Sequence, residues 1–348
     1  MLPCGTFNET YAQDVAIVRT RFQWGLTIGA IILAFCVPLF ISSMYVMGLI
    51  NYILITVIAV LGLQIVMGYC GQVSFGQAAF MAVGAYSSVI LNSKFGWPFL
   101  ACLPMAGIFA GLVGLIGGTP SLRLKGFYLA MSTLATHFIV LWVIMHIEIT
   151  GATRGMIASP PKIGSLVFDT DFNIYYVILA VTIIMAFLAK SLVRSRIGRA
   201  FIAIRDNDLA AEVLGVNLFG YKMLAFFISC FYAGIAGSLW AHFILSVHPD
   251  QFGLFQALWY VAMIIVGGMG SITGVFFGTI FLRLLDEGLS VGVTSIPSLA
   301  AALGGATPAI SWIGLGLIVV LFLIFEPRGL YHRWEIFKSS YRLYPFTY

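Results

Sequence analysis

The run LINYILITVIAVLGLQIVMGY, residues 49–69, decides the class of fold because it contains no charged residue. A helix needs about 17 to 25 mostly apolar residues to cross a bilayer, and this run has that length. The whole chain agrees, since 61% of its 348 residues are hydrophobic and only 9% are charged, against about 25% charged in soluble domains. The sequence therefore predicts an all-α polytopic membrane protein.

Similar apolar runs recur along the chain and predict about ten transmembrane helices. They lie at 22–46, 49–69, 76–93, 99–118, 125–147, 174–193, 220–245, 255–271, 273–291 and 309–326. The eighth and ninth runs are short and rich in glycine. One spanning helix followed by a re-entrant segment would fit that pair as well as two spans.

The basic residues predict the orientation, because Lys and Arg in short loops stay on the cytoplasmic side. With both termini inside, 14 of the 18 basic residues fall in the cytoplasm, Lys94, Arg154 and Lys162 fall outside, and Arg283 lies in a helix. The net charge of +5 is explained by this excess of basic residues on the cytoplasmic side, so it does not indicate a nucleic-acid partner. We therefore predict a cytoplasmic segment 1–21, a transmembrane domain 22–326 and a cytoplasmic tail 327–348.

A polar island interrupts this apolar chain between residues 194 and 222. It contains eight charged residues, and burying them in lipid at about 2.5–3.5 kcal/mol each would cost on the order of 20 kcal/mol. The island must therefore be cytoplasmic. Asp206, Asn207 or Asp208 can cap a helix start there, and Gly215 can end that helix two turns later.

This short helix has an apolar face, because Leu209, Val213 and Val216 recur at spacings of four and three. One interpretation is a loop helix that packs on its own transmembrane bundle. The other is a helix that docks into a groove of a partner protein, which the small residues and the turn of AAEVLG, 210–215, favour.

Several blocks, in the right order, resemble one known family. GYCGQVSFGQAAFMAVGAY (68–86) contains G-x-x-G-x-x-S-x-G, and it is followed by LRLKGFYLAMSTLA (122–135) and VGGMGSITGVFFGTI (266–280). The stretch 198–241, from GRAFIAIRDND to GSLWA, carries the closest likeness. TGATRGM (150–156) departs from the usual T-G-G at Ala152. Together these blocks resemble the permease subunits of branched-chain amino-acid ABC importers.

The resemblance implies a multi-chain importer of the bacterial inner membrane. Its partners would be a second permease subunit, two P-loop ATPase subunits that bind ATP and Mg, and an external, periplasmic solute-binding protein. This chain itself would bind no cofactor. The coupling segment 194–219 would sit in a cleft of the ATPase. Its implied contact residues are Arg205, Asp206, Asp208, Leu209, Ala211, Glu212, Val213 and Gly215.

The substrate implied is leucine, isoleucine or valine, with urea, short amides or other amino acids as alternatives within the same family. The motifs of other classes are missing from the sequence. There is no G-x-x-x-x-G-K-[ST], no H-E-x-x-H and no C-x-x-C. GLSVG, 288–292, follows a membrane helix rather than a strand, so it lacks the setting of a hydrolase nucleophile. We predict no catalytic residue and no metal site.

An ion-coupled carrier is the competing class, because ionisable residues inside membrane helices are functional candidates. Placement favours interfacial positions for His146, Glu148 and His242. Arg283, with Asp286 and Glu287, is expected to form a local ion pair near the outer end of its helix. His137 lies near the middle of its helix, and we expect it to be a hydrogen-bonded packing residue.

Two glycine-rich junctions are candidates for translocation or gating. They supply the candidate residues Gly68, Gly71, Ser74, Gly76, Gly267 and Gly270. Both junctions are expected at the cytoplasmic face as tight turns, with substrate contact near Ser74 as a second possibility. On the outer side, the loops 148–173 and 288–308 could dock a binding protein or be plain solvated loops. The aromatic, basic tail is expected to anchor at the interface.

Overall fold

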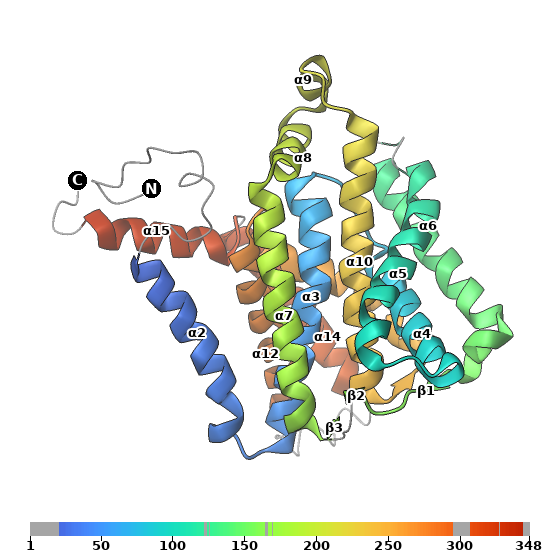
Figure 1. Ribbon diagram of the computed structural model, residues 1–348. Helices are drawn as coiled ribbons and strands as arrows, with labels where there is room; N and C mark the ends of the chain where they lie inside the picture. Colours follow the sequence, from blue (N-terminus) through green and yellow to red (C-terminus); the bar gives the residue numbers. More distant parts are fainter. Residues whose placement is uncertain are drawn as a thin grey trace.

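The computed structural model describes residues 21–121, 124, 126–163, 166–168, 170–294, 307–326 and 328–343. Long helices stand side by side in a bundle, and a helical extension projects beyond it at one end (Figure 1). The helices are α2 (Arg21–Phe40), α3 (Met44–Leu63) with its π-helical continuation (Gln64–Tyr69), α4 (Gln77–Phe95), α5 (Phe99–Ser121), α6 (Phe127–His146), α7 (Asp171–Arg194), α8 (Arg196–Asp206), α9 (Asp208–Val213), α10 (Leu218–Ile244), α11 (Leu254–Gly267), α12 (Ile272–Thr294), α14 (Thr307–Phe325) and α15 (Leu330–Leu343).

Four short strands lie on the side of the bundle opposite α9 (Figure 1). They are β1 (Met156–Ile157), β2 (Lys162–Ile163), β3 (Leu166–Val167) and β4 (Ser246–Val247), paired antiparallel as β1 with β4 and β2 with β3. Because β4 directly follows α10, its pairing with β1 ties the long loop after α6 to the end of α10.

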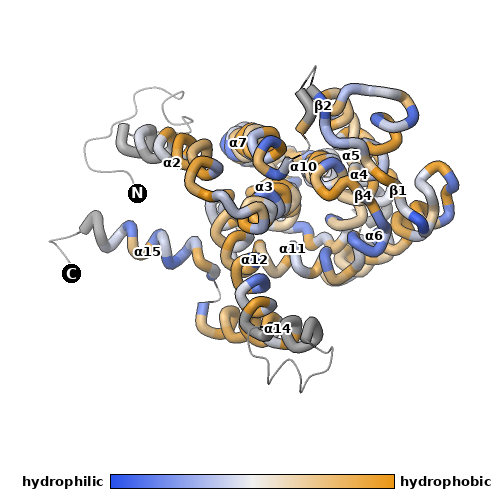
Figure 2. Tube along the Cα trace, turned by 90° about the horizontal axis from the view of Figure 1, so that it is seen from below, coloured by the Kyte–Doolittle hydropathy of each residue, from blue (hydrophilic) through white to orange (hydrophobic). Residues whose placement is uncertain are grey.

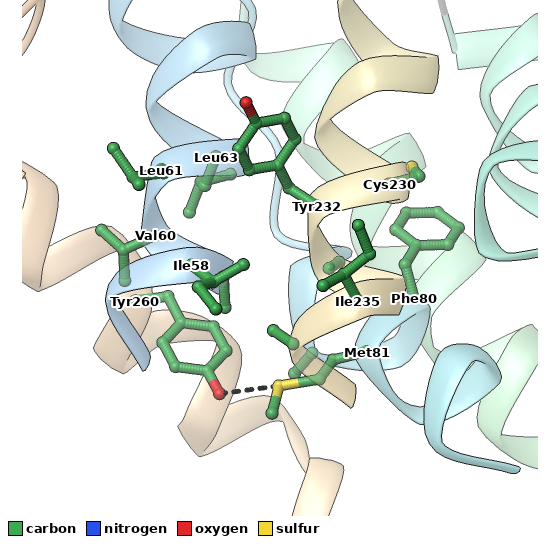
Figure 3. Packing of buried hydrophobic residues seen from close by; sticks show 14 of the residues in the cluster. Ile58, Val60, Leu61, Leu63, Phe80, Met81, Cys230, Tyr232, Ile235 and Tyr260 are labelled. Atoms are coloured by element: carbon green, nitrogen blue, oxygen red, sulfur yellow. Dashed lines mark hydrogen bonds between the residues drawn. The ribbon is translucent and has the colours of Figure 1, made fainter. Parts of the chain in front are cut away.

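Helices α3 and α10 form the centre, with the other helices around them (Figure 2). Both are apolar on every side, which is typical of helices buried within a larger bundle. Ile58 and Leu61 of α3 are fully buried, and Tyr232 of α10 lies beside them (Figure 3). Tyr260 of α11 donates a hydrogen bond to the sulfur of Met81 on α4, 3.1 Å away.

Glycines let α4 and α10 approach closely. A Cβ on Gly84 would overlap the backbone of Gly234, and one on Gly237 would overlap the carbonyl oxygen of Met81. Small residues at such positions allow membrane helices to pack backbone against backbone. Gly234 and Gly237 are therefore packing residues between these two helices.

Each of the ten predicted runs contains a helix in the described residues. Within the described ranges, six segments are long and apolar enough to cross a membrane: Met44–Tyr69, Phe99–Thr119, Phe127–His146, Asp171–Arg194, Leu218–Ile244 and Pro249–Gly267. The bent pair Ile313–Phe325 and Leu330–Ser340, at 42°, would make a seventh. The protein is therefore a polytopic membrane protein, while the count of ten crossings and the side of each terminus stay predictions. Residues 1–20 lie outside the described part.

Candidate functional site

Helix α9 is the short island helix that the sequence predicts. The Asn207 side chain caps it by accepting a hydrogen bond from the backbone N–H of Ala210 at 3.1 Å. Gly215 ends the turn with a φ of +85°, a conformation that costs little only for glycine. Both predicted boundaries of this helix are confirmed.

The apolar side chains of α9 face away from the protein. Leu209, Val213 and Leu214 are 64%, 88% and 82% exposed, whereas Ala211 is buried. Figure 1 shows α9 at the far tip of the molecule, beyond the ends of α7 and α10. The prediction that Val216 shares this exposed apolar face is wrong, because Val216 is partly buried and packs against the core. Exposed apolar residues on a projecting helix indicate a docking surface rather than internal packing.

Helix α8 precedes α9 and was not anticipated from the sequence. Ser195 caps it by accepting from the Gly198 N–H at 3.4 Å, and Phe201 and Ile204 are buried against the bundle. The spacing of Ile197, Phe201 and Ile204, four and three apart, is the signal that could have revealed it. Through these apolar anchors, α8 attaches α9 to the transmembrane helices.

Arg205 is the point where the island meets both glycine junctions. Its Nη1 donates to the carbonyl oxygen of Gly68 at 3.0 Å, and Asp206 holds the guanidinium at 2.9 Å. A Cβ on Gly270 would lie 3.1 Å from Nη1, and one on Gly71 would lie 2.9 Å from the Cγ of Arg205. Two junctions about 200 residues apart therefore converge on one side chain of the coupling segment.

A buried glutamine joins the two junctions from within. The Nε2 of Gln64 donates to the carbonyl oxygens of Gly268 and Ser271, at 3.2 and 3.1 Å. Gly268 and Gly270, with φ values of +113° and +82°, form the sharp turn between α11 and α12. The predicted tight turn at this second junction is confirmed.

The first glycine-rich junction, which contains Gly68, Gly71 and Gly76, is not the tight turn that the sequence predicts. After Gly71 the chain is non-helical until α4 begins at Gln77. The Nε2 of Gln77 donates a hydrogen bond to the carbonyl oxygen of Ala59 at 2.7 Å. Ala59 lies on α3, ten residues before the end of its π-helical continuation at Tyr69, which is about 15 Å of helix. Segment 71–76 therefore leads back into the bundle. Ser74 is buried there, and its hydroxyl accepts from the Gly76 N–H.

A polar pocket opens beside this junction. Its volume is about 350 Å³, and its lining includes Cys70, Gln72, Arg205, Asp208 and Lys222. Burial raises the pKa of the Cys70 thiol to about 12, although the positive charge of Lys222 opposes that shift. Cys70 is therefore an unreactive packing residue at pH 7.

The other polar candidates lie apart from this site. His146 and Glu148 are exposed, as predicted. His242 lies in the last turn of α10, at the end of the helix as predicted, but it is 1% exposed and bonds Ser88 and the Ser159 carbonyl oxygen. His137 is fully buried, but neither ring nitrogen has a hydrogen-bond partner among the described residues, so the expected hydrogen bond is missing.

The described parts of the loop 148–173 are folded onto the bundle rather than being free in solvent. Thr150 and Ala158 are buried, and Ala158 donates from its N–H to the carbonyl oxygen of Leu245 at 3.0 Å. Asp171 is half-buried at the start of α7. The second outer candidate, 288–308, lies largely outside the described residues.

A Gly71→Ala substitution tests the Arg205 contact. Left-handed backbone costs a non-glycine residue about 1–2 kcal/mol, and the new Cβ would also press on Arg205. Gly96→Ala is the matched control, since Gly96 has a φ of +65° with open space around it. We expect Gly71→Ala to lower the Tm in detergent by about 2 °C more than the control does. An equal decrease of the Tm in both variants would contradict the contact between Gly71 and Arg205.

Comparison with known proteins assigns the chain to a family. The family model described as branched-chain amino acid transport system / permease component matches residues 45–325. No solved structure matches the chain at a significant level.

The relatives include two amino-acid permeases and one permease for another cargo. The high-affinity branched-chain amino acid transport system permease protein LivM of Escherichia coli is 32% identical over 302 residues, 80% of this chain and 68% of the relative. The probable LivM of Methanocaldococcus jannaschii is 23% identical over 78% of this chain and 88% of the relative. The autoinducer 2 import system permease protein LsrC of Enterobacter is 30% identical over 57% of each chain. The chain therefore belongs to the branched-chain amino acid permease family and is a transport subunit rather than an enzyme.

Proposed function

We propose that this chain is one membrane half of an ATP-driven importer of leucine, isoleucine and valine in a bacterial inner membrane. Its partners are a second permease subunit, two P-loop ATPases that carry ATP and Mg, and an external solute-binding protein. The observation that carries the proposal is the exposed apolar surface of α9, connected through α8 and Arg205 to both glycine junctions.

The surface of α9 supports docking to the ATPase. Leu209, Val213 and Leu214 would lose their exposed apolar area in a groove, at a gain of about 25 cal/mol per Å². Glu212 is exposed beside them and supplies a charged contact. Short helices with a few apolar anchors are a common mode of recognition between proteins.

Arg205 supports the transmission of movement from α9 to the bundle. When the ATPases close on ATP, α9 moves, and α8 moves with it because only Asn207 separates the two helices. Phe201 and Ile204, which are buried against the bundle, then pass that movement to the transmembrane helices. Arg205 then displaces Gly68, the neighbouring Gly71 and Gly270 together. These glycines have little side-chain packing to resist a change of backbone angle. Alternating access follows if the two junctions open and close the cytoplasmic end.

Co-purification tests this assembly. The tagged chain is extracted from its native membrane in mild detergent, and its partners are identified by mass spectrometry. We expect two copies of P-loop ATPase and a second permease for each complex. A chain that purifies alone, and imports leucine when driven by a proton or sodium gradient, would instead be an ion-coupled carrier.

A further inference from the structure

Arg283 lies deep in the bundle and not near the outer end of its helix. It is in the middle of α12, twelve residues after Ser271, or about 18 Å of helix from the α11–α12 turn. Its side chain is 5% exposed. An arginine at such a depth is costly unless it is paired or has a function, so its contacts decide which applies.

The contacts of Arg283 leave two of its three guanidinium nitrogens without a hydrogen-bond partner among the described residues. Its Nη1 lies 3.7 Å from the Asp286 carboxylate, which is a loose ion pair, and its guanidinium carbon lies 3.9 Å above the ring of Tyr52. The buried Nε and Nη2 have no hydrogen-bond partner among the described residues. The carboxylate of Glu287 has a different partner, since it accepts a hydrogen bond from the hydroxyl of Tyr45. The predicted local ion pair is confirmed, but it does not satisfy the guanidinium.

The unused donors lie between α3 and α12, in a row of polar and aromatic residues that we call the polar seam. It consists of Tyr52, Gln64, Thr279 and Arg283. Gln64 contacts Ser271, and Tyr52 contacts Arg283, so the two helices run antiparallel along each other. Figure 2 shows them side by side. Thr279, one turn before Arg283 on the same face of α12, is fully buried, and its hydroxyl has no described partner.

Unpaired atoms concentrate on this seam. Four of the nine buried side-chain atoms without a described partner are there: Gln64 Oε1, Thr279 Oγ1, Arg283 Nε and Arg283 Nη2. Buried polar atoms are normally satisfied, so such a concentration indicates a ligand or a path for one. The seam runs from Tyr52 to Gln64, and Gln64 contacts the second glycine junction.

We infer that Arg283 binds the carboxylate of an amino acid in transit along this seam. The inference rests on the proposed function and names its substrate contact. The planar guanidinium offers Nε and Nη2 side by side, the pair of donors that matches a carboxylate. The half-buried Asp286 carboxylate suits the ammonium group of the same zwitterion.

Aromatic neighbours extend the site toward α10. The ring of Trp240 lies 4.8 Å from that of Tyr52, measured between centroids. An aliphatic side chain fits against such rings at no polar cost. A simple amine would leave the paired donors of Arg283 unsatisfied, because it carries no acceptor oxygen, and urea would offer them one neutral oxygen where a carboxylate offers two charged ones. The site therefore selects for α-amino acids.

The test uses the whole complex in proteoliposomes, supplied with its binding protein and with a leucine analogue that carries a diazirine in the side chain. Illumination during ATP-driven uptake labels the residues nearest the substrate, and peptide mapping identifies them. We expect labels on α3 and α12 around Tyr52 and Arg283. Arg283→Gln should remove those labels and lower leucine uptake at least tenfold, and Arg283→Lys should restore part of both.

Arg333→Gln is the matched control, because Arg333 is also ion-paired, to Glu326, but lies exposed on α15. It should leave labelling and uptake unchanged. Labels confined to other helices, or wild-type uptake by Arg283→Gln, would overturn the inference while the proposed function stands. If Arg283→Gln does not assemble, the labelling map of the wild type alone decides. A wild-type complex that imports no leucine would overturn both.

Discussion

A Val213→Arg substitution is expected to remove the ATPase subunits from the purified complex and to reduce ATP-dependent leucine uptake at least tenfold. Val213 is 88% exposed, so the change costs the isolated chain little. In a docked complex, however, the new guanidinium would be buried in an apolar groove without a partner, at a cost of several kcal/mol. Loss of the partner with retention of the fold is therefore the specific result.

Ile157→Arg is the matched control for Val213→Arg. Ile157 is 84% exposed, but it lies on β1 at the opposite end of the bundle. The control should retain its ATPases, while Val213→Arg loses them and keeps the Tm of the wild-type chain. If both variants retain the ATPases, α9 is not the docking helix and the coupling assignment fails.

A Gly84→Leu substitution is expected to prevent assembly of the bundle or to lower its stability by more than 3 kcal/mol. A side chain at Gly84 would overlap the backbone of Gly234, and backbone atoms cannot move aside as a flexible side chain can. Overpacking a core costs about 1–3 kcal/mol even where side chains can adjust. The measurement is the yield of monodisperse protein in detergent and its Tm.

Gly316→Leu is the control for Gly84→Leu. Gly316 is also in a membrane helix, α14, but a Cβ there would meet nothing within 4 Å. Its yield and Tm should match those of the wild type. Equal damage from both substitutions would show that a leucine in place of glycine in a membrane helix, and not the close approach of α4 and α10, determines the effect.

Local patterns in the sequence predict a large part of this fold. Length and hydropathy locate ten helical runs, because a membrane helix satisfies its own backbone and needs no distant partner to be recognised. The ends of α9 are equally local, since the Asn207 cap and the Gly215 turn act within a few residues. The docking role of Leu209 and Val213 is supported by exposure that only the structure reveals.

Distant contacts could not be predicted in the same way. Nothing near Arg205 in the sequence indicates that it meets Gly68 and Gly270. His242 seemed interfacial from its position in the helix, but the folded outer loop covers it. Arg283 lies in the middle of α12 rather than near its outer end, and its unpaired donors depend on the approach of α3. These features arise from packing between segments far apart in the chain.

The most direct test of the account is leucine uptake by the purified complex in proteoliposomes with its binding protein outside. Uptake is measured with ATP, with a non-hydrolysable ATP analogue, and with ATP plus ionophores that collapse proton and sodium gradients. We predict uptake with ATP whether or not the ionophores are present, and none with the analogue. Uptake that survives without hydrolysis and disappears with the ionophores would contradict the account.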